Sequence, residues 1–271
     1  MLKQLFHITR PAADAPPNDV LLMEVGADYM GYALANAAIK SISEISYYTF
    51  DSEAYERLND IYKPIKDKAD GCQKVVICLA FPQAVLVPDK FYSEDNHQHF
   101  LQPVYDITNT ILLHDHVTIW HLHNVYAFPK SLPLITTDHF PQLEYIHAYS
   151  IALKNDTIRA SQQIAVHFTT TQFSVKVKKE QKLLLMQTFS FQTPLDVVYV
   201  LLKISAEMDL KQEETDIILS GLIDEQSDLY KELYNYFLHL QFAAIAEDKL
   251  ITSDYPPHFF ASIYNLASCV L

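Results

Sequence analysis

The pattern of apolar and polar residues is clearest between residues 182 and 242, where it predicts strand, helix, strand, helix and strand in turn. The apolar residues of the first strand share its odd-numbered face: Leu183, Leu185, Phe189 and Phe191. A short apolar run over 216–220, closed by Gly221, is typical of a strand that is buried on both faces. A strand–helix–strand segment of this length predicts two parallel strands joined by a right-handed crossover.

Both helices in this stretch have recognisable starts. Thr193 followed by Pro194 combines a favoured N-cap residue with a favoured first helical residue, and Ser227 or Asp228 caps the second helix. Beyond Pro194 the apolar residues recur at helical spacing: Leu195, Val198, Tyr199, Leu202 and Ala206. We therefore expect this stripe to be buried against the sheet.

The rest of the chain predicts further strands and helices. Residues 1–17 are rich in proline and are expected to form a loose N-terminal lead. Asp51 is expected to cap a helix that ends near Lys63. Short apolar strands are predicted at 20–25, 29–35, 45–50 and 74–80. Later elements are predicted as a helix over 94–113, a strand over 117–123, a helix over 126–134, and a last helix carrying Phe260, Ile263, Tyr264 and Ala267.

An internal repeat is visible in this order of elements. Residues 23–34 (MEVGADYMGYAL) have the layout of residues 166–177 (VHFTTTQFSVKV), and each segment continues with a strand, a helix and an apolar strand. The repeat is one of pattern, with low identity. It predicts an α/β protein with two similar domains facing a cleft, each with a mixed sheet flanked by helices. The expected domains are residues 18–150 and 151–271.

Composition narrows the possible partners. The chain has 271 residues, of which 49% are hydrophobic, and 20 Lys and Arg against 33 Asp and Glu give a formal charge of −13. This charge argues against binding to nucleic acid or to an anionic membrane, both of which need a basic surface.

No apolar run approaches the roughly 18 residues of a membrane span. Three cysteines without CxxC spacing are typical of a reducing compartment, so we expect a cytoplasmic protein.

Several segments resemble a known family: VLVPDKFYSED (85–95), MQTFSFQTPLDVVYVLL (186–202), and DIILSGLID with LYKELYNYF (216–224 and 229–237). They are similar to a family of uncharacterised proteins from Bacteroidetes that is defined only as a domain of unknown function. Its members of known structure resemble the actin-like ATPases, which have duplicated ribonuclease-H-like domains. The resemblance extends from about Asp19 to the end of the chain. It implies this fold but brings no established activity or substrate.

The resemblance also indicates where a nucleotide would bind. Actin-like ATPases use two phosphate-binding hairpins, in which glycine lets backbone N–H groups approach phosphate and Asp organises magnesium. By position, Glu24 and Gly26 stand in the first hairpin of this chain. His167 stands in the second hairpin with Thr169, Thr170 and Thr171. Gly221, after Ser220, stands at the element that lies beside adenosine.

These positions depart from the superfamily pattern. Glu24 and His167 replace aspartates, and β-branched threonines replace the glycines of the second hairpin. The whole chain has only four glycines. We therefore expect a non-catalytic protein without a cofactor, which acts through contact with an unidentified protein partner. The alternative is a nucleotide-binding actin-like ATPase with altered metal-site residues.

Two other kinds of site are suggested by short motifs. His114, His116, His121 and His123 form two His-x-His pairs, and residues two apart share one face of a strand. In one continuous strand the two pairs would point to opposite faces, and no Cys or carboxylate cluster completes the set, so we expect no metal site. A serine nucleophile is also not expected, because no G-x-S-x-G elbow occurs and Ser220-Gly221 marks the end of a strand.

Overall fold

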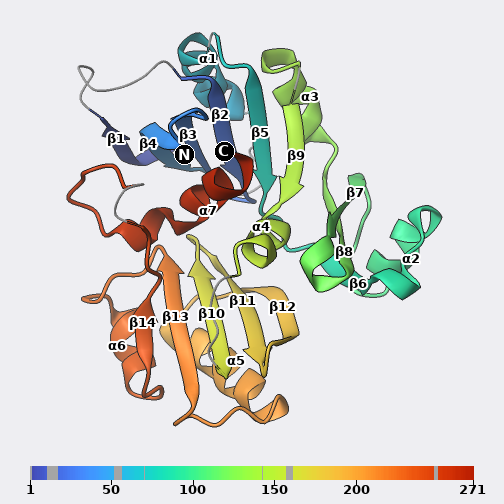
Figure 1. Cartoon of the computed structure of the whole chain (residues 1–271), viewed down its shortest axis with the longest axis vertical. Coiled ribbons are helices and arrows are strands. Elements are labelled where there is room, and N and C mark those ends of the chain that lie inside the picture. The colour runs from blue at the N-terminus through green and yellow to red at the C-terminus, as the bar shows by residue number, and fades with distance from the viewer. Residues whose placement is uncertain are drawn as a thin grey trace. The chain divides into compact units, whose positions relative to one another are not determined.

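The computed structural model describes residues 2–10, 18–51, 57–69, 71–141, 143–156, 161–246 and 250–271 (Figure 1). The chain divides into two compact units. Unit 1 comprises Met1–Asp156, Glu247–Ser253 and Ser262–Leu271, and unit 2 comprises Thr157–Ala246 and Asp254–Ala261. The sequence placed the whole C-terminal part in the second domain, whereas the last ten residues belong to unit 1.

Unit 1 is built on a six-stranded mixed sheet in the order β1-β4-β3-β2-β5-β9. Its strands are β1 (Lys3–Thr9), β2 (Val20–Val25), β3 (Tyr29–Asn36), β4 (Ser41–Thr49), β5 (Lys74–Leu79) and β9 (Leu143–His147). Strands β2, β3 and β4 are antiparallel neighbours, while β5 runs parallel to β2 and β9 runs parallel to β5. Helix α1 (Leu58–Lys68) follows β4, and the cap expected at Asp51 precedes residues 52–56, which lie outside the described residues.

The loose lead expected over residues 1–17 is wrong for residues 3–9, which form β1 and pair antiparallel with β4. Polar residues interrupt the apolar pattern around Phe6 and Ile8, so the sequence did not predict a strand here. Ile8 is buried, and pairing with β1 satisfies backbone groups that β4 would otherwise leave open at the sheet edge. Residues 11–17 of the lead lie outside the described residues.

Unit 2 repeats five of these six strands, without a counterpart of β1 among the described residues. Its order is β12-β11-β10-β13-β14, with strands β10 (Gln162–Phe168), β11 (Gln172–Lys179), β12 (Lys182–Ser190), β13 (Thr215–Gly221) and β14 (Leu240–Phe242). Strands β10, β11 and β12 are antiparallel neighbours, and β13 is parallel to β10 as β5 is to β2. Helix α5 (Pro194–Glu207) occupies the place of α1. The predicted internal repeat is therefore confirmed at the level of topology.

Helix α5 starts as predicted but presents a different face to the core. The Thr193 side chain accepts a hydrogen bond from the Asp196 N–H, and Asp196 accepts in return from the Thr193 N–H, so that a capping box is formed. The residues buried against the sheet are Val197, Val198, Leu201, Ile204 and Ser205. The stripe expected to be buried is wrong except at Val198, since Leu195 and Tyr199 are exposed and Leu202 is half-buried. The helix carries two apolar stripes, and the sheet covers only one.

A small three-stranded antiparallel sheet distinguishes unit 1 from unit 2. It contains β6 (Ala84–Pro88), β7 (Thr110–Val117) and β8 (Leu122–Pro129), ordered β6-β8-β7, and it projects beside β9 (Figure 1). Val87, Val125 and Ala127 pack with Leu101 of the short helix α2 (His97–Leu101) in its core. Along the chain, this sheet is inserted between β5 and α3 (Ser131–His139). In unit 2 the chain passes from β13 to α6 (Asp228–Tyr234) without such an insertion.

The helix predicted over 94–113 is confirmed only at its start, where the 3₁₀ turn Glu94–Asn96 leads into α2, and the predicted strand over 117–123 and helix over 126–134 are wrong. A turn at Asn109, which has a φ of +56°, ends the first pattern before β7 begins. A 3₁₀ turn at Thr118–Trp120 and a left-handed His121 reverse the chain, so that β7 and β8 form a hairpin. The apolar run over 122–129 has a composition that occurs both in strands and in helices. Periodicity alone does not distinguish a short buried strand from a buried helix.

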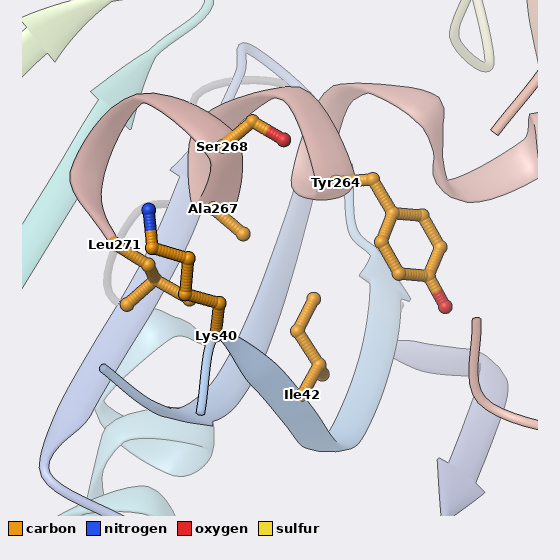
Figure 2. Close-up of a pocket in the computed structure, with 6 residues that line it drawn as sticks. All are labelled: Lys40, Ile42, Tyr264, Ala267, Ser268 and Leu271. Atoms are coloured by element: carbon orange, nitrogen blue, oxygen red, sulfur yellow. The ribbon is translucent and has the colours of Figure 1, made fainter. Parts of the chain in front are cut away.

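Helix α7 (Ala261–Val270) returns to unit 1 after the chain has built unit 2. The Ile263 side chain packs over Gly31 of β3, where an added Cβ would lie 3.6 Å from Ile263 Cδ1. A pocket beside α7 is lined by Lys40, Ile42, Tyr264, Ala267, Ser268 and Leu271 (Figure 2). No helix in the described part of the chain has the length and hydropathy needed to cross a membrane.

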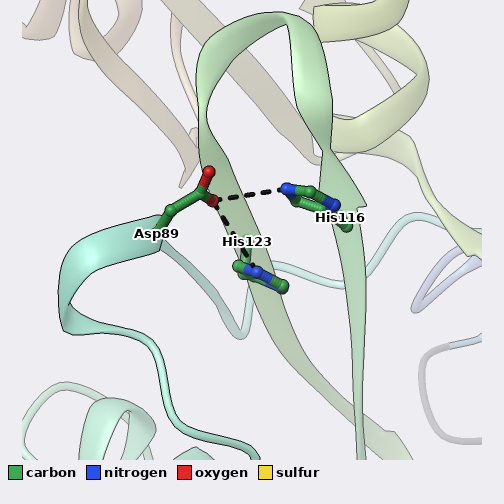
Figure 3. A group of neighbouring side chains, drawn as sticks. All are labelled: Asp89, His116 and His123. Atoms are coloured by element: carbon green, nitrogen blue, oxygen red, sulfur yellow. Dashed lines mark ion pairs between the residues drawn. The ribbon is translucent and has the colours of Figure 1, made fainter.

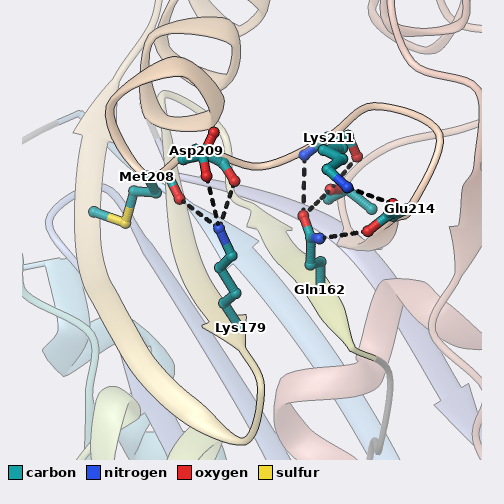
Figure 4. Close-up of polar contacts among 7 residues, drawn as sticks. Gln162, Lys179, Met208, Asp209, Lys211 and Glu214 are labelled. Atoms are coloured by element: carbon teal, nitrogen blue, oxygen red, sulfur yellow. Dashed lines mark hydrogen bonds and ion pairs between the residues drawn. The ribbon is translucent and has the colours of Figure 1, made fainter.

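Polar contacts fix the connection between α5 and β13 in unit 2 (Figure 4). The Gln162 side chain accepts a hydrogen bond from the Lys211 N–H at 3.0 Å and donates one to Glu214 Oε2 at 2.9 Å. Lys179 Nζ donates to the carbonyl oxygens of Met208 and Asp209, at the C-terminal end of α5. A cation at this end of a helix interacts favourably with its free carbonyls.

Candidate functional site

The first candidate hairpin, between β2 and β3, holds Glu24 and Gly26. Glu24 is buried, and its Oε1 accepts a hydrogen bond of 2.6 Å from the Tyr29 hydroxyl. Its second oxygen, Oε2, is buried and has no hydrogen-bond partner among the described residues. The Gly26 N–H donates to the Tyr29 carbonyl at 3.0 Å and closes the turn. Both positions named by the resemblance are therefore engaged by Tyr29.

The Tyr29 ring fills the space over Gly26. A Cβ added to Gly26 would lie 2.2 Å from Tyr29 Cε1, so that only glycine fits beneath the ring. The ring is stacked on Tyr47 with centroids 5.3 Å apart. Burial, followed by the nearby Glu24 carboxylate, raises the pKa of Tyr29 well above its usual value, and the phenol remains a hydrogen-bond donor at neutral pH. The glycine thus makes room for a side chain of the protein itself.

The second candidate hairpin, between β10 and β11, holds His167 and Thr169. His167 Nδ1 lies 3.0 Å from the Ser220 hydroxyl oxygen, across the parallel pair of β10 and β13. The Thr169 N–H and hydroxyl both donate to the Gln172 carbonyl, at 2.9 and 3.1 Å. These contacts close the hairpin on itself and use donors that a phosphate-binding turn would present to its ligand.

Gly221, the last candidate, has a φ of +76° at the end of β13. An added Cβ would lie 2.0 Å from the Phe168 carbonyl oxygen, and the next N–H, of Leu222, donates to this same oxygen at 2.9 Å. Glycine is therefore needed here for the close approach of two strands.

The structure brings His167, Ser220 and Gly221 together at one end of the unit 2 sheet, and Glu24 and Gly26 together in unit 1. Sequence analysis missed Tyr29, which occupies the first hairpin. Its signal was an aromatic residue three positions after Gly26, on the returning strand of a tight hairpin.

Residues 12–240 match the family described as Protein of unknown function (DUF3822). The chain belongs to the DUF3822 family. No match was found among curated protein sequences. A solved structure from Bacteroides thetaiotaomicron VPI-5482, a protein with actin-like ATPase fold and unknown function, matches this DUF3822 chain with a TM-score of 0.77 and 14% identity. The match covers 93% of this chain and 96% of the other.

Two further solved structures support the same fold. The PilM–PilN type IV pilus biogenesis complex matches with a TM-score of 0.56 and 12% identity, over 94% of the DUF3822 chain and 99% of the other. The ethanolamine utilization protein EutJ from Carboxydothermus hydrogenoformans matches with a TM-score of 0.51 and 9% identity, over 96% and 92%. The DUF3822 chain therefore has the actin-like fold with two ribonuclease-H-like units, and at these identities the likeness concerns the fold alone.

Proposed function

We propose that this protein is a non-catalytic member of the actin-like fold that acts by binding another protein. The observation that carries the proposal is the Tyr29 ring, which covers Gly26 and holds the Glu24 carboxylate in a hydrogen bond. Phosphoryl transfer depends on donors and a metal held in position around the phosphates. Here the corresponding glycine and carboxylate contact a buried phenol instead.

The second hairpin supports the same conclusion, because Thr169 donates both its N–H and its hydroxyl to Gln172 within the turn. One observation favours the alternative, a nucleotide-binding protein with altered metal chemistry. Within the described ranges, the buried Glu24 Oε2 has no hydrogen-bond partner, and a carboxylate oxygen in this state is a potential ligand for magnesium.

The surface of unit 2 carries apolar side chains suited to a protein partner. Leu195 and Tyr199 are one turn apart on α5 and are 58% and 66% exposed. Helix α6 packs against α5, and Tyr234 at its end is 68% exposed. Exposed apolar side chains that are neighbours on one helix, as Leu195 and Tyr199 are, form the kind of patch that marks an interaction surface. The similar fold of PilM occurs in a complex with PilN, which supports a binding role for this fold.

The proposal places the protein in the cytoplasm, in keeping with the free cysteines Cys72, Cys78 and Cys269. The formal charge of −13 favours a partner that surrounds its apolar contacts with basic residues.

Calorimetric titration with Mg-ATP tests the nucleotide part of the proposal. We expect no heat of binding at millimolar nucleotide and no rise in melting temperature, since any ligand of the native state raises it. Micromolar binding that is lost in Glu24→Ala would establish the alternative.

Partner capture from the native cell tests the binding part. Wild-type protein should retain a specific partner that is lost when Leu195→Ser and Tyr199→Ser are combined. The matched control is Leu134→Ser in α3 of unit 1, where the side chain is 72% exposed. Equal loss in the control, or equal retention in all variants, would refute a role for the α5 surface.

A further inference from the structure

The three-stranded sheet of unit 1 brings Asp89, His116 and His123 together on one face (Figure 3). His116 and His123 are direct partners across β7 and β8. Asp89 follows β6 and lies two residues beyond Val87, the partner of His123 on the other side of β8. Side chains two residues apart in an extended chain share a face. The central strand therefore carries His123 between the other two groups.

The hairpin removes the reason for expecting no metal here. That expectation placed all four histidines, from His114 to His123, in one continuous strand, with the two His-x-His pairs on opposite faces. The left-handed turn at His121 places His116 opposite His123, and Asp89 supplies the carboxylate that the sequence alone did not locate.

The spacing of the three groups fits ligands of a common ion better than hydrogen bonds. His116 Nε2 and His123 Nε2 lie 3.3 and 3.7 Å from the same oxygen, Asp89 Oδ1. A separation of 3.7 Å is too long for a hydrogen bond. Two ligand atoms that are each about 2.0–2.1 Å from a tetrahedral zinc ion lie about 3.3 Å apart.

The surroundings of His123 suit a ligand. Its ring is stacked at 3.5 Å on Tyr92 and at 4.4 Å on His116, which fixes its plane.

We propose that Asp89, His116 and His123 bind a divalent transition metal ion, through two imidazole nitrogens and one carboxylate oxygen. Two nitrogens and one oxygen suit zinc and its neighbours in the first transition row, and three protein ligands leave a coordination position open for water or a further ligand. The His116 side chain is 46% exposed, so the position left open by the three ligands is accessible to water. The inference uses other residues than the proposed function and stands independently of it.

Titration of the metal-free full-length protein with zinc chloride at pH 7.5 tests the proposal. We expect one ion per chain with a dissociation constant in the micromolar range or below, and no comparable binding of magnesium. Asp89→Asn and His123→Ala should each weaken zinc binding by at least about tenfold, since even residues that only support ligands contribute 10- to 100-fold. Cobalt should give the visible absorption of a low-coordinate site, lost in both variants.

The control variant is His239→Ala, which removes an exposed histidine of unit 2 and should leave zinc binding unchanged. Asp89→Asn keeps the size of an exposed side chain, so its fold can be verified by circular dichroism. Zinc affinity unchanged in both Asp89→Asn and His123→Ala, or no stoichiometric binding by wild-type protein, would overturn the site.

Discussion

Gln162 and Gln163 are neighbours on β10, and both are almost fully buried, but their amides have opposite surroundings. The Gln162 amide bonds Lys211 and Glu214 and accepts from the Thr215 hydroxyl at 3.3 Å (Figure 4). Both polar atoms of the Gln163 side chain are buried, and neither has a hydrogen-bond partner in the part of the chain that the structure describes. A buried amide stabilises a fold only where it is paired.

The two glutamines should therefore respond in opposite directions to replacement by methionine, which has a similar length. Gln162→Met should lower the free energy of unfolding by about 1–3 kcal/mol, because it leaves buried partners unpaired. Gln163→Met should raise it by about 1 kcal/mol, because it removes two unpaired polar atoms. Urea denaturation measures both. Changes of the same sign would contradict this account.

His147 is a second buried polar residue with a measurable consequence. Its Nε2 lies 2.9 Å from the Phe81 carbonyl oxygen, and its Nδ1 accepts from the Tyr149 N–H at 3.1 Å, at the start of α4 (Ala148–Lys154). Both contacts are satisfied by the neutral ring with its proton on Nε2. Burial lowers the pKa of His147 to about 4, partly offset by the bond to Phe81.

Because the unfolded chain binds this proton near pH 6.5 and the folded protein only near pH 4, stability is complete above pH 6.5 and falls below it. The shift corresponds to a loss of about 3 kcal/mol between pH 7 and pH 4. His147→Asn keeps an acceptor for Tyr149 and removes the titration. Its unfolding free energy should depend less on pH over this range by about the same amount, as measured by urea denaturation at each pH. An unchanged slope would show that other groups cause the loss.

At the scale of elements, α5 offers a direct test of which face is buried. Leu201 is fully buried, and Leu202, its neighbour in sequence, is only partly buried. Leu201→Ala should lower the free energy of unfolding by about 2–5 kcal/mol, the usual range for a core leucine. Leu202→Ala should cost clearly less, and chemical denaturation of both variants gives the comparison. Equal losses would mean that the helix is turned differently from the structure described.

Elements with local start and stop signals were predictable from the sequence. Thr193 and Pro194 predicted the start of α5. The short apolar runs of β2 and β13 predicted buried strands, and each of them pairs in parallel with a neighbour, β2 with β5 and β13 with β10. The rotation of α5 was not predictable, because apolar residues occur on two of its faces and only tertiary packing selects one. The segment 94–129 failed for a related reason, since the chain reversals at Asn109 and His121 use left-handed residues other than glycine.

The candidate site was only partly predictable. The sequence located Glu24, Gly26, His167, Thr169 and Gly221 in two hairpins and a strand end, but not what those residues contact. Tyr29 and Gly26 are three residues apart, and their contact depends on how tightly the hairpin turns. The group of Asp89, His116 and His123 required the register of three strands, which a sequence does not specify by itself.

At the scale of the whole molecule, the C-terminal helix should control the stability of a unit that begins 260 residues earlier. Deletion of Ser262–Leu271 removes buried side chains of unit 1, among them Ile263, Tyr264 and Leu266. Hydrogen exchange in β2 and β3 should become faster in the truncated protein, while β10 and β13 of unit 2 remain protected. Faster exchange throughout, or in neither unit, would contradict this division of the chain.

The return of α7 to unit 1 also bears on the order in which the protein folds during synthesis. Domains in a chain ordinarily fold from the N-terminus as they leave the ribosome. In this protein Ile263, which packs over Gly31, is made after every strand of unit 2. Unit 1 therefore cannot complete its core until α7 has left the ribosome, and the nascent chain must carry an open β2–β3 sheet through the synthesis of the strands of unit 2.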